Sequence, residues 1–521
     1  MDARELRKEV GKVPAEELLE RILDELTKTQ ARLRRVEAEN ERLRKRLAQY
    51  EPEVAAETRP SPAGESGAKF SVEAEEQRRR KRKRKRSPGR RPSRLKFAAA
   101  ETIEEIRPPG VPREQQRLIR ERAVWRLRDG RGVLVGYRIF DAPGCSVPAI
   151  PGVTPRCEFG IEILVVLAFL VYLIGISLDK ACVLLQFFCQ LPIRKSQADA
   201  LLRQLGRHWQ AEFDTLCTLL TRAAVVYMDE TGWQVGREKC SLWAFLSDSA
   251  RVFLFGCRKD AATLETMLPV ELFQGVGVSD HAAVYTNQFA AGQKCWAHLL
   301  RKAIRLSLLY PRNRKYKRFL DELLAIYREG KRAAADAHLG ARGRHRRVAE
   351  LEGRLCGLCN PHWHEPADDC RPHERDFYNL VNELLTLVMA EELFTFVLRP
   401  EVDPTNNLSE RELRSPAQDR KAGRTNQTAS GARRRSVIVS VLQSLKVALP
   451  QFTLGSVVSE VTRWIETGVS LFVETLRSHP PPQPTAARAF PRQRGSPRPS
   501  SVTRAIPSRS PPGACATSGT A

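Results

Sequence analysis

Hydrophobic residues recur every seven positions near the start of the chain. Two series, offset by three residues, fill the a and d positions of more than four heptads: Leu19, Leu26, Leu33, Asn40 and Leu47, and Ile22, Thr29, Val36, Leu43 and Tyr50. This repeat predicts a coiled coil over residues 1–52. Asn40 at an a position favours a parallel, in-register homodimer, because a buried Asn pairs best with its own copy. The alternative is a lone amphipathic helix packed on its own domain.

The heptad repeat ends after this segment, and the C-terminal end of the chain lacks a hydrophobic repeat as well. Residues 53–110 are rich in Pro, Gly, Ser and Glu and include nine consecutive basic residues, 78–86. Like charges in a row repel one another, so we expect a disordered basic linker that can grip phosphates. Pro, Arg, Ser and Thr dominate residues 477–521, which predicts a disordered tail.

Apolar positions at helical spacing dominate the next segment, and residues 111–222 are predicted to be mainly helical. Residues 161–191 are apolar nearly all round, and residues 195–220 are amphipathic. This region either binds DNA or serves only to pack against the rest of the protein. Its uncharged run, residues 163–178, falls short of the roughly 20 residues that span a bilayer. We therefore expect a buried helix and no membrane.

From residue 223 the pattern changes to short runs of Val, Phe, Leu and Trp. The runs at 224–227, 241–247, 251–256 and 275–278 predict strands, and those at 261–267 and 296–309 predict helices. Three strands, a helix and a returning strand indicate an α/β fold with a mixed sheet. Residues 310–400 are again mostly helical and charged.

Composition narrows the functional class. The chain has 521 residues, of which 42% are hydrophobic, so it is not disordered throughout. Its net charge is +25, and segments 78–96 and 478–521 carry nineteen of these charges. Such segments suit a polyanionic partner. Twelve irregularly spaced cysteines and a charged N-terminus without an apolar leader favour a reducing cytoplasm.

Three acidic residues lie where a metal site is expected. Asp229 and Asp280 each follow a predicted strand, and Glu410 lies in a predicted helix, 403–414, whose N-cap is Thr405 or Asn406. Carboxylates held rigidly at a sheet edge suit Mg²⁺, which prefers oxygen ligands. Two such metals support phosphoryl transfer. The helix also presents Asn407, Glu410, Arg411 and Arg414 on one face, which can equally be an ordinary solvated face.

At these residues the sequence resembles a known family. The motifs VVYMDETGW, GVGVSDHAAVY, KCWAHLLRK and NNLSERELRSPAQDRKAGRT occur in this order over about residues 223–467. Together they resemble the catalytic blocks of the insertion sequence 66 family of bacterial DDE transposases. The resemblance implies an RNase H-like mixed-sheet catalytic core, formed by residues 223–309 and 401–476 and interrupted by a helical insertion, residues 310–400.

The resemblance also implies the chemistry and the partners. Asp229, Asp280 and Glu410 would be catalytic and would bind two Mg²⁺ or Mn²⁺ ions. The protein would cut DNA at the element ends and join the 3′-OH to target DNA, as a homodimer or a larger synaptic assembly in the bacterial cytoplasm, associated with the nucleoid. Residues expected to contact DNA or its phosphates are Asn407, Arg411, Arg414, Lys421 and Arg424. The alternative is a catalytically inactive, transposase-derived DNA-binding protein.

Two further groups carry side chains of the kind that bind metals. Cys356, Cys359, His364 and Cys370 lie close in sequence and can supply the four ligands of a structural Zn²⁺ site, although their spacing matches no standard zinc finger. The alternative is that they have no ligand role. Glu230 adjoins Asp229 on a strand and should therefore point to the opposite face of the sheet.

Overall fold

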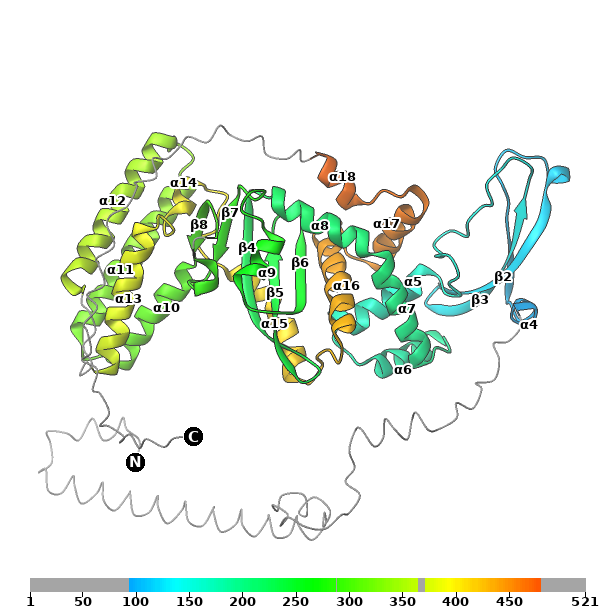
Figure 1. Cartoon of the computed structure of the whole chain (residues 1–521), viewed down its shortest axis with the longest axis horizontal. Coiled ribbons are helices and arrows are strands. Elements are labelled where there is room, and N and C mark those ends of the chain that lie inside the picture. The colour runs from blue at the N-terminus through cyan, green and yellow to red at the C-terminus, as the bar shows by residue number, and fades with distance from the viewer. Residues whose placement is uncertain (1–92, 287, 364–370, 479–521) are drawn as a thin grey trace, which may run out of the picture. The chain divides into compact units, whose positions relative to one another are not determined.

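The computed structural model describes residues 93–286, 288–363 and 371–478, which contain a three-stranded sheet, a five-stranded sheet and helices around them (Figure 1). The predicted coiled coil, most of the basic linker and nearly all of the C-terminal tail lie outside these residues. Both sheets belong to one compact unit that begins at Arg91.

The first sheet corrects two sequence predictions. Its elements are α4 (Ser93–Ala98), β1 (Thr102–Ile106), η1 (Arg113–Gln115), β2 (Arg117–Arg128) and β3 (Arg131–Asp141). The strand order is β1-β3-β2, with β1 parallel and β2 antiparallel to β3. The mainly helical prediction for 111–222 is therefore wrong over residues 117–141, and the linker predicted to reach residue 110 already contains α4 and β1.

A tight turn explains why this segment forms a hairpin. Asp129 and Gly130 both have positive φ angles, 49° and 77°. That is the backbone conformation of the two-residue hairpin turn for which Asp-Gly is a preferred sequence. Alternation along the strands buries Val124, Val135 and Tyr137 in a small core of their own. The Asp-Gly pair between two runs of alternating polarity was a signal that the sequence already contained.

Helices follow the first sheet, as the apolar pattern predicts. They are α5 (Ile161–Ala168), the π-helical turn η2 (Phe169–Leu173), α6 (Leu178–Cys189), α7 (Lys195–His208) and α8 (Gln210–Arg222). The apolar run 163–178 lies in α5 and η2 only as far as Leu173, leaves helical structure over residues 174–177, and reaches α6 at Leu178. The expected single buried helix is therefore interrupted, although most of the run packs into the main hydrophobic core. Among the described residues, no helix is both long enough and apolar enough to cross a membrane.

The five-stranded sheet is mixed, with strand order β6-β5-β4-β7-β8. Strands β4, β5 and β6 are antiparallel, and β4, β7 and β8 are parallel. The elements are β4 (Val225–Val235), β5 (Glu238–Leu246), β6 (Arg251–Cys257), α9 (Ala261–Met267), β7 (Val276–Ser279), η3 (Ala283–Tyr285) and β8 (Ala291–Lys294). The sheet therefore has the mixed α/β character predicted, with β8 as a strand that the sequence pattern missed.

Helix α16 (Ala429–Ala448) covers the β6 edge of this sheet. Three buried serines on one side of the helix, Ser436, Ser440 and Ser444, accept hydrogen bonds from backbone N–H groups of β6 at 2.8–2.9 Å. Four helical residues rise about 6.0 Å and two strand residues about 6.6 Å, so the two repeats nearly match. The serines thus satisfy edge groups that would otherwise be open to pairing.

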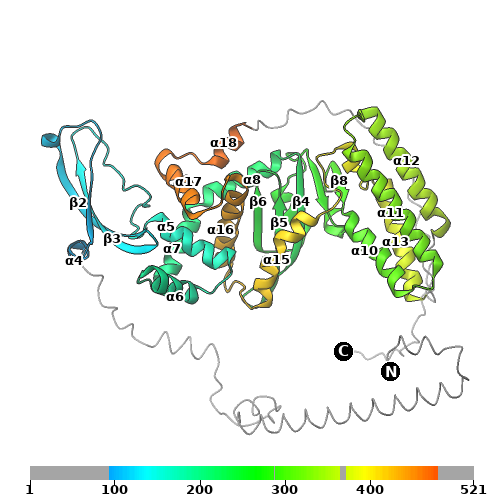
Figure 2. The ribbon, with the colours of Figure 1, turned by 180° about the vertical axis from the view of Figure 1, so that it is seen from behind.

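A group of helices lies at the opposite edge of the sheet, beside β8 (Figures 1 and 2). A second hydrophobic core joins these helices to Val276 and Val278 of β7. The helices are α10 (Trp296–Leu309), α11 (Arg314–Ala335), α12 (Ala341–Cys359), α13 (Pro372–Met389) and α14 (Thr395–Leu398), with the short turn η4 (Asn360–His362) after α12. Helices therefore occupy the segment between β8 and residue 400, where the sequence predicts a helical insertion.

The chain returns to the sheet in α15 (Asn407–Lys421), which packs on β4 and β5. Helices α16, α17 (Leu454–Thr467) and α18 (Leu471–Ser478) follow. The hydrogen bond between the indole of Trp233 and Asn426, 3.0 Å long, fixes the connection between α15 and α16 against β4. Residues 193 positions apart in the sequence thus meet at one end of the sheet.

Candidate active site

Two of the predicted acids lie where two neighbouring parallel strands meet, with Asp229 inside β4 and Asp280 directly after β7. Tyr227 of β4 pairs with Val278 of β7. Continuing that register by two residues places Asp229 beside Asp280. Neighbouring strands are about 4.8 Å apart, so the two carboxylates start from adjacent backbone positions. One detail of the prediction is wrong: Asp229 does not end its strand, because β4 continues to Val235 through its pairing with β5.

The surroundings of these two acids are crowded with negative charge. Burial, followed by the neighbouring carboxylates of Glu230, Asp280 and Glu410, raises the pKa of Asp229 to about 7. The Asp280 side chain accepts a hydrogen bond of 3.0 Å from the backbone N–H of Ala282, which holds it at the end of β7. Like charges brought together in this way favour either a proton or a cation between them.

Helix α15 brings the third acid, Glu410, in its first turn. Asn406 is the N-cap residue, one of the two predicted, but its side chain makes no capping bond. Instead the buried Asn406 amide donates to the Met228 carbonyl at 2.6 Å, and its backbone N–H donates to Cys295 Sγ at 3.1 Å. Asn406 therefore ties the start of α15 to the residue before Asp229.

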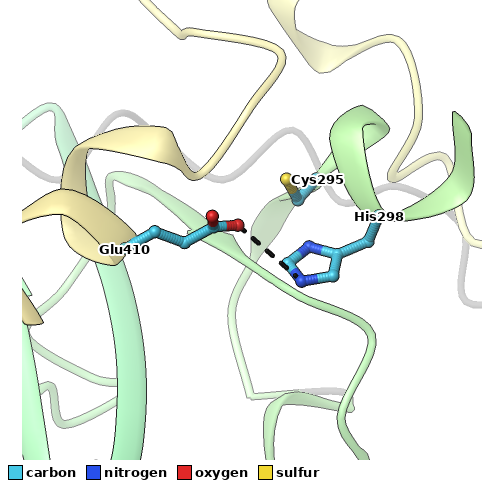
Figure 3. Close-up of side chains that lie close together, drawn as sticks. All are labelled: Cys295, His298 and Glu410. Carbon is cyan, nitrogen blue, oxygen red and sulfur yellow. Dashed lines mark ion pairs between the residues drawn. The ribbon is translucent and has the colours of Figure 1, made fainter. Parts of the chain in front are cut away.

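Glu410 has partners on α10 (Figure 3). Arg301 donates to both carboxylate oxygens, at 3.1 and 3.3 Å, and His298 Nε2 lies 3.7 Å from Oε1. Ligand atoms of Cys295, His298 and Glu410 all lie within 4.8 Å of one another, a spacing that could hold a metal ion. Burial raises the pKa of the Cys295 thiol, which favours the neutral form rather than the thiolate that binds metals.

Glu230, next to Asp229 on β4, has side-chain partners of its own. It pairs with Trp243 of β5, next to the Asp229–Ala244 pair, so the alternation of the strand separates the two side chains. Its carboxylate accepts from the Tyr285 hydroxyl and forms an ion pair with Lys259. Protein partners thus occupy the Glu230 carboxylate, and its exclusion as a metal ligand remains a prediction.

The residues predicted to contact DNA differ in whether a protein group already pairs with them. Asn407, Arg411, Arg414 and Lys421 are exposed along α15. Arg424, just beyond the helix, forms a 3.0 Å ion pair with the buried Asp419. The sequence singled out Asn407 as a DNA contact, whereas the neighbouring Asn406 makes the contacts across the site. Sequence reasoning also missed Arg301, because nothing in the sequence links α10 to a helix about a hundred residues later.

The predicted zinc cluster is only partly described. Cys356 and Cys359 lie on α12, and Cys359 is buried in the second core, where burial raises its pKa to about 12. His364 and Cys370 lie outside the described residues. The four residues as a zinc site therefore remain a prediction.

A pocket of about 250 Å³ opens beside Asp280, between α10 and α13. Glu383 lines this pocket and pairs with His281 at 2.9 Å and with Lys302 at 2.5 Å. Burial alone would raise the pKa of Glu383, but hydrogen bonds from His281 and Lys302 outweigh it and lower that pKa. The helical segment after β8 thus forms one wall of the acidic site.

Comparison with known families identifies the chain. The model of the Transposase IS66 family matches residues 156–434, more than half of the chain and a range that includes Asp229, Asp280 and Glu410. The chain belongs to the IS66 transposase family. The resemblance seen in the sequence motifs is therefore confirmed, and family membership supports a transposase role and a DNA substrate. The matched range begins after the first sheet. No curated protein matches the chain.

Proposed function

We propose that this IS66-family member is an active DDE transposase, which cuts DNA at the ends of its element and joins the freed 3′-OH to target DNA. The observation that carries the proposal is the convergence of three acids. Asp229 of β4 and Asp280, directly after β7, come from neighbouring parallel strands, and the hydrogen bond from Asn406 to Met228 brings the helix of Glu410 to the same place.

The donor set fits divalent metal ions. Oxygen ligands from Asp229, Asp280 and Glu410 match the preference of Mg²⁺ or Mn²⁺, and their mutual repulsion, expressed in the raised pKa of Asp229, is what a bound cation would relieve. Two such ions, when bound, supply charge stabilisation at the attacking and leaving oxygens of phosphoryl transfer.

Basic side chains near the acids hold the Glu410 carboxylate and suit contacts to DNA. Arg301 holds the Glu410 carboxylate through both oxygens. Exposed Arg411 and Arg414 lie on the same helix and suit contacts to DNA phosphates near the scissile bond. Asn407 and Lys421 belong to the same proposed contact surface, whereas Arg424 would have to share its guanidinium with Asp419.

The architecture is consistent with an RNase H-like core. Three antiparallel strands continue into parallel β7 and β8, and α15 returns to β4 after a helical segment. We further propose that the heptad repeat pairs two chains, that larger assemblies join two DNA ends, and that the protein acts in the bacterial cytoplasm at the nucleoid.

A cleavage and joining assay tests the proposal. The substrate is a labelled duplex with an end of the element, taken from the DNA that flanks the gene, and a plasmid serves as target. With Mg²⁺ or Mn²⁺ we expect a nick at the end and strand transfer into the plasmid, and with a chelator neither. DNA binding without cleavage by the wild-type chain would favour the inactive, transposase-derived DNA-binding protein instead.

A further inference from the structure

A strongly basic pocket lies between α7 and α16, away from the acids. It has a volume of about 440 Å³, and four arginines line it: Arg203 and Arg207 from α7, and Arg433 and Arg434 from α16. Arg203, Arg207 and Arg433 are exposed, and Arg434 is half-buried. None of these residues belongs to the predicted DNA contacts on α15.

The two helices approach closely at this pocket. A Cβ added at Gly206 would lie only 3.0 Å from Cγ of Arg434, so the glycine makes room for the arginine stem. Arg434 is then fixed by Asp199, at 2.8 Å, which also pairs with Arg203 at 2.9 Å. The back of the pocket is therefore formed by an ion-paired arginine, and Nε of Arg434 is buried without a hydrogen-bond partner.

The charges of the pocket are not balanced. Asp199 is shared by two of the arginines, and within the described part of the chain neither Arg207 nor Arg433 forms an ion pair. Two exposed guanidiniums beside the ion-paired guanidinium of Arg434 are a suitable receptor for phosphate oxygens, because each guanidinium donates in a planar fork.

The position of the pocket indicates which polyanion it serves. Glu410 and Lys421 are eleven residues apart on α15, which corresponds to about 16 Å along the helix axis. The connection 422–428 then leads directly into α16, where Ser430 and Arg433 reach the pocket. At a rise of 3.4 Å per base pair, the 16 Å between Glu410 and Lys421 along α15 corresponds to about five base pairs of duplex.

On this basis we infer that the α7–α16 pocket binds the phosphate backbone of duplex DNA several base pairs from the site of cleavage. This inference rests on the proposed function, since it takes the DNA cut at Asp229, Asp280 and Glu410 as the ligand. The α7–α16 pocket holds the duplex in place and does not read the base sequence, because phosphate contacts carry no base information.

The test is duplex binding by the full chain as a function of salt, measured by fluorescence anisotropy. The variant is Arg207→Ala/Arg433→Ala, in which both exposed guanidiniums are removed. The matched control is Arg342→Ala/Arg346→Ala, which removes two exposed arginines of α12. Arg207→Lys/Arg433→Lys keeps the charge at the pocket. Thermal unfolding of each variant confirms that it is folded.

We expect the pocket variant to bind duplex about tenfold more weakly than wild type at 0.1 M salt. Its plot of log affinity against log salt should be less steep by about 2, because each phosphate that the protein no longer neutralises removes about 0.9 from the steepness. The lysine variant should keep most of that slope, and the α12 control should match wild type. Equal slopes for the pocket and α12 variants would overturn the inference. If wild type cuts terminal DNA while the slopes are equal, only the pocket is refuted, whereas absence of cutting by wild type refutes the proposed function.

Discussion

The buried serines of α16, Ser436, Ser440 and Ser444, give a sharp test of how the edge of the five-stranded sheet is held. Ser440 is fully buried and accepts a 2.8 Å hydrogen bond from the backbone N–H of Phe253, which is also fully buried. Ser440→Ala removes the acceptor and leaves that N–H in a site where water has no access. The substitution changes volume by a single oxygen, so the cavity it leaves contributes little.

The expected magnitude follows from the unpaired group. A buried donor that loses its partner costs about 1–3 kcal/mol, whereas a surface substitution usually changes the free energy of unfolding by less than about 0.5 kcal/mol. Ser415→Ala on α15 is the matched control, because Ser415 is exposed. We expect Ser440→Ala to lower the free energy of unfolding by about 1–3 kcal/mol relative to that control.

Two assays check this prediction. Urea unfolding gives the change in free energy, and hydrogen exchange followed by mass spectrometry gives the protection of the peptide that contains β6. Exchange in that peptide should become faster in Ser440→Ala and stay unchanged in Ser415→Ala. Equal stability of the two variants, with unchanged protection of β6, would refute the idea that the serines satisfy the edge of the sheet.

Two further substitutions test the positioning role of Asn406 and the contribution of charged Glu460 to stability. We expect Asn406→Ala to lower the cleavage rate about 10- to 100-fold, as for other groups that orient metal ligands, while duplex affinity stays at the wild-type value; an unchanged rate would argue against a positioning role. Burial raises the pKa of Glu460, but hydrogen bonds from Arg463 and Trp464 outweigh it and lower that pKa below its ordinary 4.5. Charged Glu460 therefore stabilises the fold above pH 4.5, and this stability is lost as the pH falls through the lowered value. Glu460→Gln should cost about 1.5–3 kcal/mol at pH 7 and less near pH 3 in urea unfolding, and an equal cost at both pH values would contradict this.

The sequence indicated which acids to consider, but it did not indicate the contacts that surround them. Asp229 and Asp280 could be found because each follows a short apolar run, and a strand is visible in such a run by itself. Glu410 needed the family motifs, since one acid on a charged helix is not distinctive. The role of Asn406 could not be predicted, because its bond to Met228 joins residues 178 positions apart.

Other features were visible in the sequence only in part. The pair Asp129-Gly130 predicts a hairpin by local rules, and the helical prediction for residues 117–141 failed because the apolar residues there were given a helical period. The spacing of Ser436, Ser440 and Ser444 is also visible in the apolar run of α16. Their function is not, since the sequence does not show which strand edge the serines face.

The most direct test of the central claim is the single-turnover cleavage rate of a duplex carrying the element end, in Mg²⁺, for variants of the three acids. The variants are Asp229→Asn, Asp280→Asn and Glu410→Gln, with Glu412→Gln, a partly exposed acid on the same helix, as the matched control. We predict that each of the three reduces the rate at least about a hundredfold without weakening duplex binding, and that Glu412→Gln cuts at the wild-type rate. Wild-type cleavage by any one of the three acid variants would contradict the assignment of these residues as the catalytic site.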